Sequence, residues 1–403
     1  MKIAILTPFY KPSMGGVEHI AYHLAKKLVE RGFEVHVITT NCDNRWKIVS
    51  KQECVVEENI IVHRLSPSII RIGYATIMKD LKRNLRDIRP DIVHCHNLHP
   101  HLFQVLKWKD EMGYKVVAQL HHPVATGIDH PIARLLYKPT MKILAQLSNE
   151  IDVFVAHTYL EKQWLVNEGI EENKITIIRF PCIPDELLNY KPTSDIHDVL
   201  SADKVITYVS RIHPRKGQHL LVEAARHLKQ EVIDFKVYIA GPPANRSYSD
   251  SLRKLIEKHR LEKHIVLEQR TLLEKEKNDV IASSDIFALT SLKEYTPVIL
   301  LEAIALRTPV VATAVGAIPE LLSICNGAKE AVRMEFIKNL KVLIDARRLV
   351  RVVNPEPYQI AMVLKEMMNS DYAGYRHTLA TLASLHSASI LTESLVRVYS
   401  AII

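Results

Sequence analysis

Two glutamates stand in an otherwise apolar run of the chain, KEYTPVILLEAIALRTPVVATAVGAIPE, residues 293–320. Burying an ionised carboxylate is costly unless it is hydrogen-bonded, paired or used in binding. Glu294 and Glu302 are separated by seven residues, and a carboxylate can accept hydrogen bonds from both hydroxyls of a ribose or of a sugar diol. The pattern indicates either hydroxyl acceptors in a binding site or, for Glu302, a side chain on an exposed helix face.

The residues around the first glutamate predict where an anion would bind. DIFALTS (285–291) is typical of a strand, and the apolar run after it predicts a helix that begins at Pro297. The first backbone N–H groups of a helix have no partner within the helix and attract anions. We therefore expect a phosphate or another anion near Thr296, Pro297 and Val298.

Two further loops have the composition of a phosphate site. SRIHPRKG (210–217) follows the predicted strand KVITYV, and its Arg211 and Lys216 suit a diphosphate, although a solvated basic loop has the same composition. PSMGGVE (12–18) places Gly15 and Gly16 in the turn after the first predicted strand, where a ligand can approach the backbone closely. This turn lacks the G-x-G-x-x-G spacing of a nicotinamide site.

Histidine is abundant, with 20 residues, and several histidines cluster at the ends of two predicted strands: His94, His96, His99, His101, His121 and His122. His94 and His96 share one strand face, which leaves a metal site open. No helical H-x3-H pattern accompanies them, and the chain has no Asp-x-Asp motif. Buried or ligand-contacting histidines are therefore favoured over a metal, with His121 the best candidate to contact a substrate.

The elements that must position these residues alternate between strand and helix, which predicts an α/β fold with parallel, doubly wound sheets. One series fills residues 1–190 and a second fills 203–380, with a polar linker between 181 and 203 and a last helix in 381–403. Such sheets bind ligands at the carboxyl ends of their strands. We therefore expect two domains that face a central cleft.

Composition narrows the class of protein. The net charge of +8 fits an anionic partner, but aromatic residues make up only 6% and no helix-turn-helix is found, so nucleic acid is not expected. None of the five cysteines forms a C-x-x-C pair, which fits a reducing cytoplasm. No apolar stretch has the length of a membrane span or of a secretory signal.

Together these motifs resemble the family 4 retaining glycosyltransferases, the group 1 glycosyltransferases with the GT-B fold. Glu294-x7-Glu302 with ALRTPVVATAVGAIPE resembles the E-x7-E motif and the residues that follow it in the family, SRIHPRKG resembles G-R-L-x3-K-G, and PSMGGVE resembles the family's glycine turn. The resemblance implies two Rossmann-like domains, an acceptor domain followed by a donor domain, and a last helix that crosses back to the first. Arg307 and Ala317 replace two glycines of the family pattern, and residues 324–348 resemble an insertion.

The resemblance also implies roles in binding a nucleotide-sugar donor. Arg211 and Lys216 would bind the diphosphate, and Gly15 and Gly16 would approach either the diphosphate or the sugar. Glu302 would bind the ribose. The sugar would be contacted by Glu294, Thr296, Pro297, Val298 and His121. Of these residues, Glu294, His121, Lys216 and Arg211 would act in catalysis.

The implied reaction is retaining, metal-independent transfer from a UDP- or GDP-sugar to an acceptor hydroxyl, with no cofactor. The acceptor would be a glycolipid or a growing glycan in cell-surface glycan synthesis. We expect a cytoplasmic enzyme, associated peripherally with the inner face of the membrane if the basic segments 81–89 and 133–144 bind lipid rather than simply being solvated. A nucleotide-sugar epimerase and a non-catalytic nucleotide-sugar or nucleic-acid binding protein are the alternatives.

Overall fold

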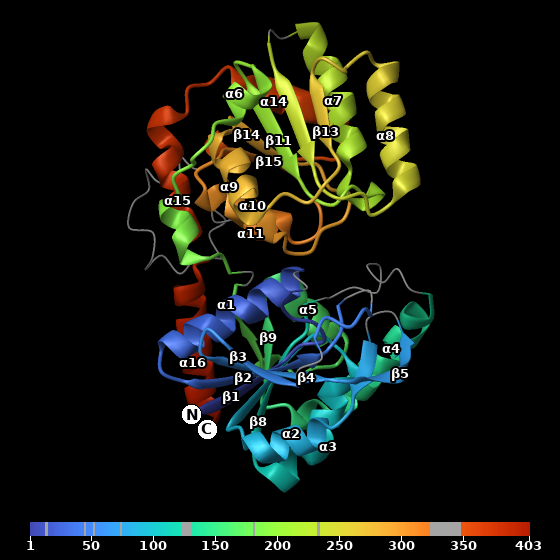
Figure 1. The fold of residues 1–403 in the computed structure, drawn as a ribbon, viewed down its shortest axis with the longest axis vertical. Coiled ribbons are helices and arrows are strands. Elements are labelled where there is room, and N and C mark those ends of the chain that lie inside the picture. The colour runs from blue at the N-terminus through green and yellow to red at the C-terminus, as the bar shows by residue number, and fades with distance from the viewer. Residues whose placement is uncertain are drawn as a thin grey trace. The chain divides into compact units, whose positions relative to one another are not determined.

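The computed structural model (Figure 1) describes residues 1–12, 15–43, 46–50, 53–72, 75–121, 131–179, 182–231, 234–322 and 348–403. The chain divides into two compact units. Unit 1 comprises Met1–Cys182 and Ala388–Ile403, and unit 2 comprises Ile183–Ser387. The apparent insertion at 324–348 lies outside the described residues, apart from its last residue.

Unit 1 is built on an eight-stranded sheet whose strands are parallel except for β3, which pairs antiparallel with β4. In spatial order the strands are β10 (Ile175–Ile177), β9 (Val153–Ala156), β8 (Lys115–Gln119), β7 (Ile92–His96), β1 (Lys2–Leu6), β2 (Glu34–Thr40), β4 (Ile60–Leu65) and β3 (Cys54–Glu57). A separate hairpin pairs β5 (Pro67–Ile72) with β6 (Ala75–Met78). The helices are α1 (Gly16–Glu30), α2 (Leu81–Ile88), α3 (Pro100–Met112), α4 (Pro131–Gln146), α5 (Tyr159–Asn167) and α16 (Ala388–Ile402).

Strand β1 shows why this sheet is covered on both faces. Ile3 and Ile5 pack with α1 and α16 in one apolar cluster, whereas Ala4 and Leu6 pack with α2, α3 and α4 in another. Successive side chains of a strand point to opposite faces, so a strand buried on both faces is apolar throughout. The run KIAIL has this composition.

Unit 2 has a six-stranded, wholly parallel sheet. Its strands in spatial order are β13 (Ile265–Glu268), β12 (Lys236–Ala240), β11 (Val205–Val209), β14 (Ile286–Leu289), β15 (Val310–Thr313) and β16 (Val350–Val353). Its helices are α6 (Ile196–Leu200), α7 (Gln218–Glu231), α8 (Arg246–Lys258), α9 (Glu274–Ser283), α10 (Val298–Ala305), α11 (Ile318–Leu321), α14 (Pro357–Met368) and α15 (Arg376–Ser384). The doubly wound α/β fold predicted from the sequence is confirmed in both units, and the predicted cleft stays a prediction.

The predicted linker, 181–203, is in large part a structured portion of unit 2. It contains a short 3-10 helix (Asp185–Asn189) and α6. The Asp279 carboxylate on α9 accepts hydrogen bonds from the Tyr190 hydroxyl at 2.7 Å and from the backbone and hydroxyl of Thr193 at 2.9 and 2.8 Å. Because a polar, turn-rich composition is typical of linkers and of such anchored loops alike, the sequence did not distinguish them.

The C-terminal segment divides later than predicted, at 387/388 instead of 380/381. Helix α15 stays with unit 2, where Leu379 and Leu382 join the core. Helix α16 belongs to unit 1, where Leu391, Leu395 and Tyr399 are buried with α1. Both helices are apolar on one face, so the pattern alone did not show which sheet each one covers.

Candidate functional site

Three loops of unit 2 meet at the carboxyl edge of its sheet. They follow β11, β14 and β15, and backbone hydrogen bonds join them: Leu292 donates to the Arg215 carbonyl at 2.8 Å, and Ala317 donates to the Tyr295 carbonyl at 3.2 Å. The Tyr208 hydroxyl, at the end of β11, donates to the Lys216 carbonyl. These contacts bring the predicted loop 210–217 and the predicted loop around Glu294 together, as the positions of their strands in the sheet require.

Two glycines allow these loops to approach so closely. Gly217 has a φ of +62°, and a Cβ there would lie 2.1 Å from the Thr290 carbonyl oxygen. Gly316 has a φ of +57°, and a Cβ there would lie 1.8 Å from the Glu294 carbonyl oxygen. Real side chains do not tolerate such distances, and this region of φ favours glycine. Both positions therefore require glycine to keep Glu294 and Lys216 in place.

Glu294 and Lys216 form the central contact of the site. The Lys216 Nζ lies 2.5 Å from Glu294 Oε1, and the Ser291 hydroxyl donates to the same oxygen at 2.7 Å. The Glu294 side chain is 9% exposed and that of Lys216 is 22% exposed. Within the described ranges, Glu294 Oε2 has no hydrogen-bond partner. The sequence predicted both residues but neither this ion pair nor Ser291.

Glu302 is buried and paired as well. Its side chain is 6% exposed, and Lys277 on α9 donates to its Oε2 at 2.8 Å. The exposed-face interpretation of Glu302 is therefore wrong. Sequence reasoning missed Lys277 because it stands in the lysine- and glutamate-rich run EKEKND, which is typical of a solvated helix face. Among the described residues, Glu302 Oε1 accepts no hydrogen bond.

The other predicted donor residues of unit 2 lie on the same loops. Arg211 is exposed on the loop after β11, and the Gln218 side chain donates to its carbonyl at 2.9 Å. Helix α10 begins at Val298 with Pro297 as N-cap, one residue later than predicted, and Thr296 precedes it. The N-terminal amides of α10 thus directly follow the loop that carries Glu294.

In unit 1, His121 stands at the end of β8 inside a buried group of histidines. Its Nε2 lies 2.6 Å from His96 Nδ1, and its ring meets the His157 ring edge-on at 4.7 Å between centroids. His121 has a φ of +57°, a strained conformation for a residue other than glycine, of the kind that concentrates at functional sites. The predicted assignment of His121 to a ligand contact stays a prediction.

Burial disfavours the charged form of His94, His96 and His157. Burial lowers the pKa of His94 to about 3 and that of His157 to about 3, and it places the pKa of His96 well below the usual range. His94 Nδ1 lies 2.6 Å from the hydroxyl of Tyr399 on α16. Across the described ranges, no group of three or more His, Cys, Asp or Glu side chains has an arrangement that holds a metal ion.

Gly15 and Gly16 begin α1, with Gly15 as its N-cap. Both glycines are exposed. A Cβ on Gly15 would lie 2.5 Å from Glu18 Oε2, because the Glu18 carboxylate bends back to accept hydrogen bonds from the backbone of Gly15 and of Glu18 itself. Burial raises the pKa of Glu18 despite these hydrogen bonds. Glu18 was part of the glycine motif but was not singled out.

The two departures from the family pattern are accommodated. Arg307 follows the last turn of α10 with a φ of +64°, and its guanidinium donates to the Leu188 carbonyl at 3.1 Å. It therefore lies beyond the C-terminal end of α10, whereas Glu294 precedes the N-terminal end, and a helix of eight residues is about 12 Å long. Ala317 is buried with a φ of −88°, which any residue adopts.

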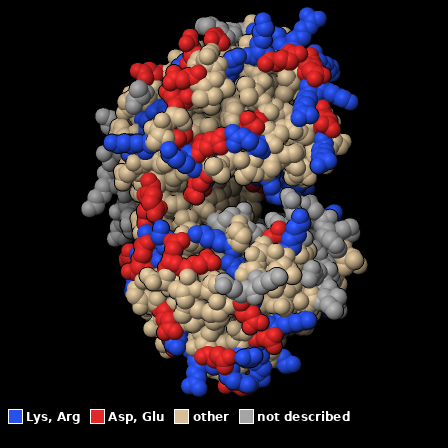
Figure 2. Space-filling model, viewed as in Figure 1, with Lys and Arg blue, Asp and Glu red and all other residues tan. Residues whose placement is uncertain are grey.

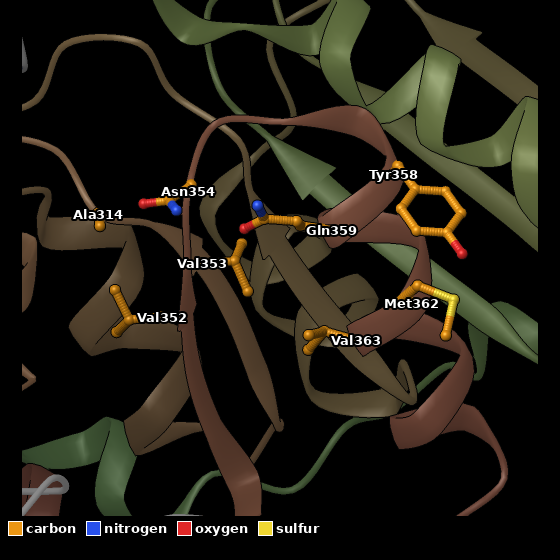
Figure 3. Close-up of a pocket in the computed structure, with 8 residues that line it drawn as sticks. All are labelled: Ala314, Val352, Val353, Asn354, Tyr358, Gln359, Met362 and Val363. Carbon is orange, nitrogen blue, oxygen red and sulfur yellow. The ribbon is translucent and has the colours of Figure 1, made fainter.

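A surface hollow of about 360 Å³ lies at another part of the same sheet edge (Figure 3). It is lined by the residue that follows β15, by the end of β16 with the residue after it, and by one face of α14: Ala314, Val352, Val353, Asn354, Tyr358, Gln359, Met362 and Val363. None of these is a predicted site residue. The hollow and the lysine–glutamate pairs are therefore different features.

Charge is mixed over the viewed surface of each unit, where acidic and basic side chains alternate (Figure 2). The face in view shows no continuous basic stripe of the kind that follows a nucleic-acid backbone. Of the helices in the described ranges, none has both the length and the apolar composition needed to cross a bilayer.

Solved structures define the class of fold. The chain is similar to HepE of Anabaena in complex with UDP, with 16% identity, 100% coverage of both chains and a TM-score of 0.71. It is similar to sucrose-phosphate synthase of Thermosynechococcus elongatus, with 15% identity, 100% of this chain and 98% of that chain covered, and a TM-score of 0.71. The fold is that of the GT-B glycosyltransferases.

Sequence comparison then gives the family. Two family profiles match most of the chain: "Glycosyltransferase Family 4" matches residues 14–181 and "Glycosyl transferases group 1" matches residues 193–326. The chain belongs to the family 4, group 1 glycosyltransferases, as its motifs predicted, and is a transferase.

Two curated relatives have specific names. The chain is 26% identical, over 79% of its length and 69% of the relative, to the phosphatidylinositol N-acetylglucosaminyltransferase GPI3 subunit of Saccharomyces cerevisiae. It is 26% identical, over 80% of its length and 81% of the relative, to N-acetyl-alpha-D-glucosaminyl L-malate synthase of Bacillus anthracis.

Proposed function

We propose that this protein transfers a sugar, with retention of configuration and without a metal, from a nucleotide-sugar to an acceptor hydroxyl. The observation that carries the proposal is the contact of Lys216 with Glu294 at the carboxyl edge of the unit 2 sheet, beside the start of α10. A cation, a carboxylate and free helix amides suit the diphosphate and the sugar hydroxyls of one ligand. The names of both relatives contain N-acetylglucosamine, and HepE was solved with UDP, so UDP-N-acetylglucosamine is the proposed donor.

The basic loop 210–217 would stabilise the negative charge that develops on the leaving group. When the glycosidic bond to the diphosphate breaks, negative charge gathers on the departing phosphate oxygen. The Lys216 ammonium has three N–H donors, so it can keep its contact with Glu294 while it donates to that oxygen. The exposed Arg211 guanidinium adds a forked pair of donors. These two cations take the part that a divalent ion plays in metal-dependent transfer.

The two glutamates would accept hydrogen bonds from the hydroxyls of the donor. Lys277 and Lys216 each occupy one oxygen of a glutamate, which fixes the carboxylate and leaves its second oxygen for a ligand hydroxyl. Glu302 would accept from the ribose and Glu294 from the sugar. From unit 1, His121 would contact the sugar, and the glycine turn would allow close approach to the donor. The departing phosphate itself would deprotonate the acceptor hydroxyl.

We place the reaction in the cytoplasm, in the assembly of a cell-surface glycan. The acceptor would be a lipid-linked or growing glycan, and the name of the Saccharomyces cerevisiae relative, which contains phosphatidylinositol, supports the lipid-linked class. Peripheral association with the inner membrane face would bring the enzyme to such an acceptor.

Donor binding tests the proposal most directly. Calorimetric titration with UDP-N-acetylglucosamine, UDP-glucose and GDP-mannose, with and without EDTA, should find one donor whose affinity EDTA does not change. Lys216→Ala should weaken that affinity by about ten- to a hundred-fold, the value of one charge-assisted hydrogen bond, and Glu302→Gln by a smaller factor. Lys254→Ala on the exposed side of α8 is the matched control and should bind normally.

The product decides between the reaction classes. Transfer with retention gives the same anomeric configuration in donor and product, which NMR of the product reads directly. Binding of none of the three donors, or a requirement for a divalent ion, would contradict the proposal. Release of free or epimerised sugar without an acceptor would favour the epimerase instead.

A further inference from the structure

Helix α4 of unit 1 has two apolar faces, and only one of them is buried. Tyr137, Met141 and Leu144 face the core of the unit. Leu135 is 76% exposed and Ile132 is 53% exposed. A helix that covers a sheet needs one apolar face, so a second one indicates another contact surface.

The exposed apolar residues of α4 form one continuous stripe. Ile132, Leu135, Leu136 and Ile143 are all exposed, and at 3.6 residues per turn they fall within about 100° of one another. Exposed apolar residues that are scattered singly need no explanation, but four on one face of one helix do. We call this stripe the outer face of α4.

A row of cations borders the outer face. Arg134, Lys138 and Lys142 are four residues apart in sequence, so they line up along one side of the helix, and all three are exposed. Across the described ranges, none of them forms an ion pair, and α4 contains no acidic residue. The charge of this face is therefore uncompensated and positive.

Helix α2 shows the contrast, because it is the other basic segment that the sequence offered for a membrane. Its apolar residues Leu81 and Leu85 are buried in the core of unit 1. Lys82 and Arg86 both pair with Glu111 on α3, at 2.6 and 3.3 Å. Helix α2 therefore has neither an exposed apolar face nor unpaired charge, and it is an ordinary solvated helix.

We propose that the outer face of α4 docks on the surface of an anionic lipid bilayer. An apolar stripe bordered by cations complements such a surface, because the apolar side chains enter the boundary of the acyl chains while the cations meet the headgroups. A second copy of this chain is a poorer occupant, since two such faces would bring cations together without counter-charges. The inference rests on the proposed function in one respect: docking here would select an acceptor whose hydroxyl is carried by a membrane lipid.

Vesicle co-sedimentation without donor or acceptor tests the surface alone. The full chain should bind phosphatidylcholine vesicles that contain phosphatidylglycerol, should release with added salt, and should not bind pure phosphatidylcholine vesicles. Lys138→Gln/Lys142→Gln should weaken binding roughly thirty-fold, because each cation near an anionic surface contributes about 1 kcal/mol. Leu135→Ser/Ile143→Ser should also weaken it, and circular dichroism should show that all variants are folded.

The matched control is Lys82→Gln/Arg86→Gln on α2, which removes the same charge and should leave vesicle binding within about two-fold. The inference is overturned if anionic vesicles are not bound, if the α4 variants bind as the wild type does, or if sedimentation shows a dimer that Leu135→Ser/Ile143→Ser abolishes. Donor titration of the same preparation separates the two proposals. Donor binding without vesicle binding refutes only the docking surface, and vesicle binding without donor binding refutes only the proposed donor chemistry.

Discussion

The buried histidines of unit 1 should make that unit sensitive to acid. Burial lowers the pKa of several of them to about 3, and we take three of these, His94, His101 and His157. In the unfolded chain an imidazole titrates near 6.5. Below that pH the unfolded state binds protons that the folded state does not bind. The stability contributed by these side chains is therefore complete above about pH 6.5 and is lost progressively as the pH falls toward 3.

The size of the effect follows from these pKa values. Each fully buried imidazole changes the free energy of unfolding by about 1.4 kcal/mol per pH unit once the pH is well below 6.5. At about pH 5.5 the three together remove roughly 4 kcal/mol. This is a large part of the 5–15 kcal/mol that holds a typical domain folded. In unit 2, burial lowers the pKa of His219, which is partly exposed, and the described residues of that unit contain no comparable group of buried imidazoles, so unit 2 should be less sensitive.

Hydrogen exchange resolves the two units in one experiment. Peptides from β7 and β8 should lose protection between about pH 7 and pH 5, after correction for the chemical exchange rate, whereas peptides from β11 and β12 should keep it. His94→Gln removes one titrating group and should reduce the slope of stability against pH in unit 1 by about 1 kcal/mol per pH unit.

Exposed His377 is the control, and His377→Gln should leave the slope unchanged. The slope, rather than the absolute stability, is the quantity to compare, because any substitution at a buried site also changes packing. Equal slopes for the two units, or an unchanged slope in His94→Gln, would refute the reasoning.

Three further predictions concern unit 2. Gly316→Ala should lower both donor affinity and thermal stability, because the new Cβ would lie 1.8 Å from the Glu294 carbonyl oxygen. Calorimetry measures the affinity and thermal melting the stability, and normal donor binding would count against the role of this glycine. Lys277→Met should destabilise the fold by roughly 2–3 kcal/mol in chemical denaturation, because it leaves the Glu302 carboxylate buried without a cation. The double variant Lys277→Met/Glu302→Gln should recover part of this lost stability. Arg307→Gly should keep donor affinity unchanged. It should alter the free energy of unfolding by less than about 1 kcal/mol, since relief of the positive φ offsets the lost hydrogen bond to the Leu188 carbonyl. A lower donor affinity in this variant would show that Arg307 acts on the site.

The sequence by itself determined the class of fold and the family. Parallel strands buried on both faces are apolar throughout, and helices that cover them repeat their apolar residues every three or four positions, so the alternation was visible without coordinates. The motifs around Glu294, Lys216 and the first glycine turn depend on local spacing, which the sequence shows directly. The loops that the structure joins in unit 2 were therefore named in advance.

The tertiary structure alone decided which side chains are partners. Lys216 and Glu294 are 78 residues apart, and His94 and Tyr399 are 305 apart. Such pairs form only because β11 and β14 are neighbours in one sheet and because α16 returns to unit 1. No local sequence pattern shows which strands and helices are neighbours in the fold.

The two basic helices illustrate the same limit at the surface. In sequence, α2 and α4 are both amphipathic and basic, and either one fitted a membrane or solvent. The structure separated them by placing Glu111 beside the cations of α2 and leaving the outer face of α4 exposed. Composition states what a helix can contact, but only packing determines which of its faces and charges are already satisfied.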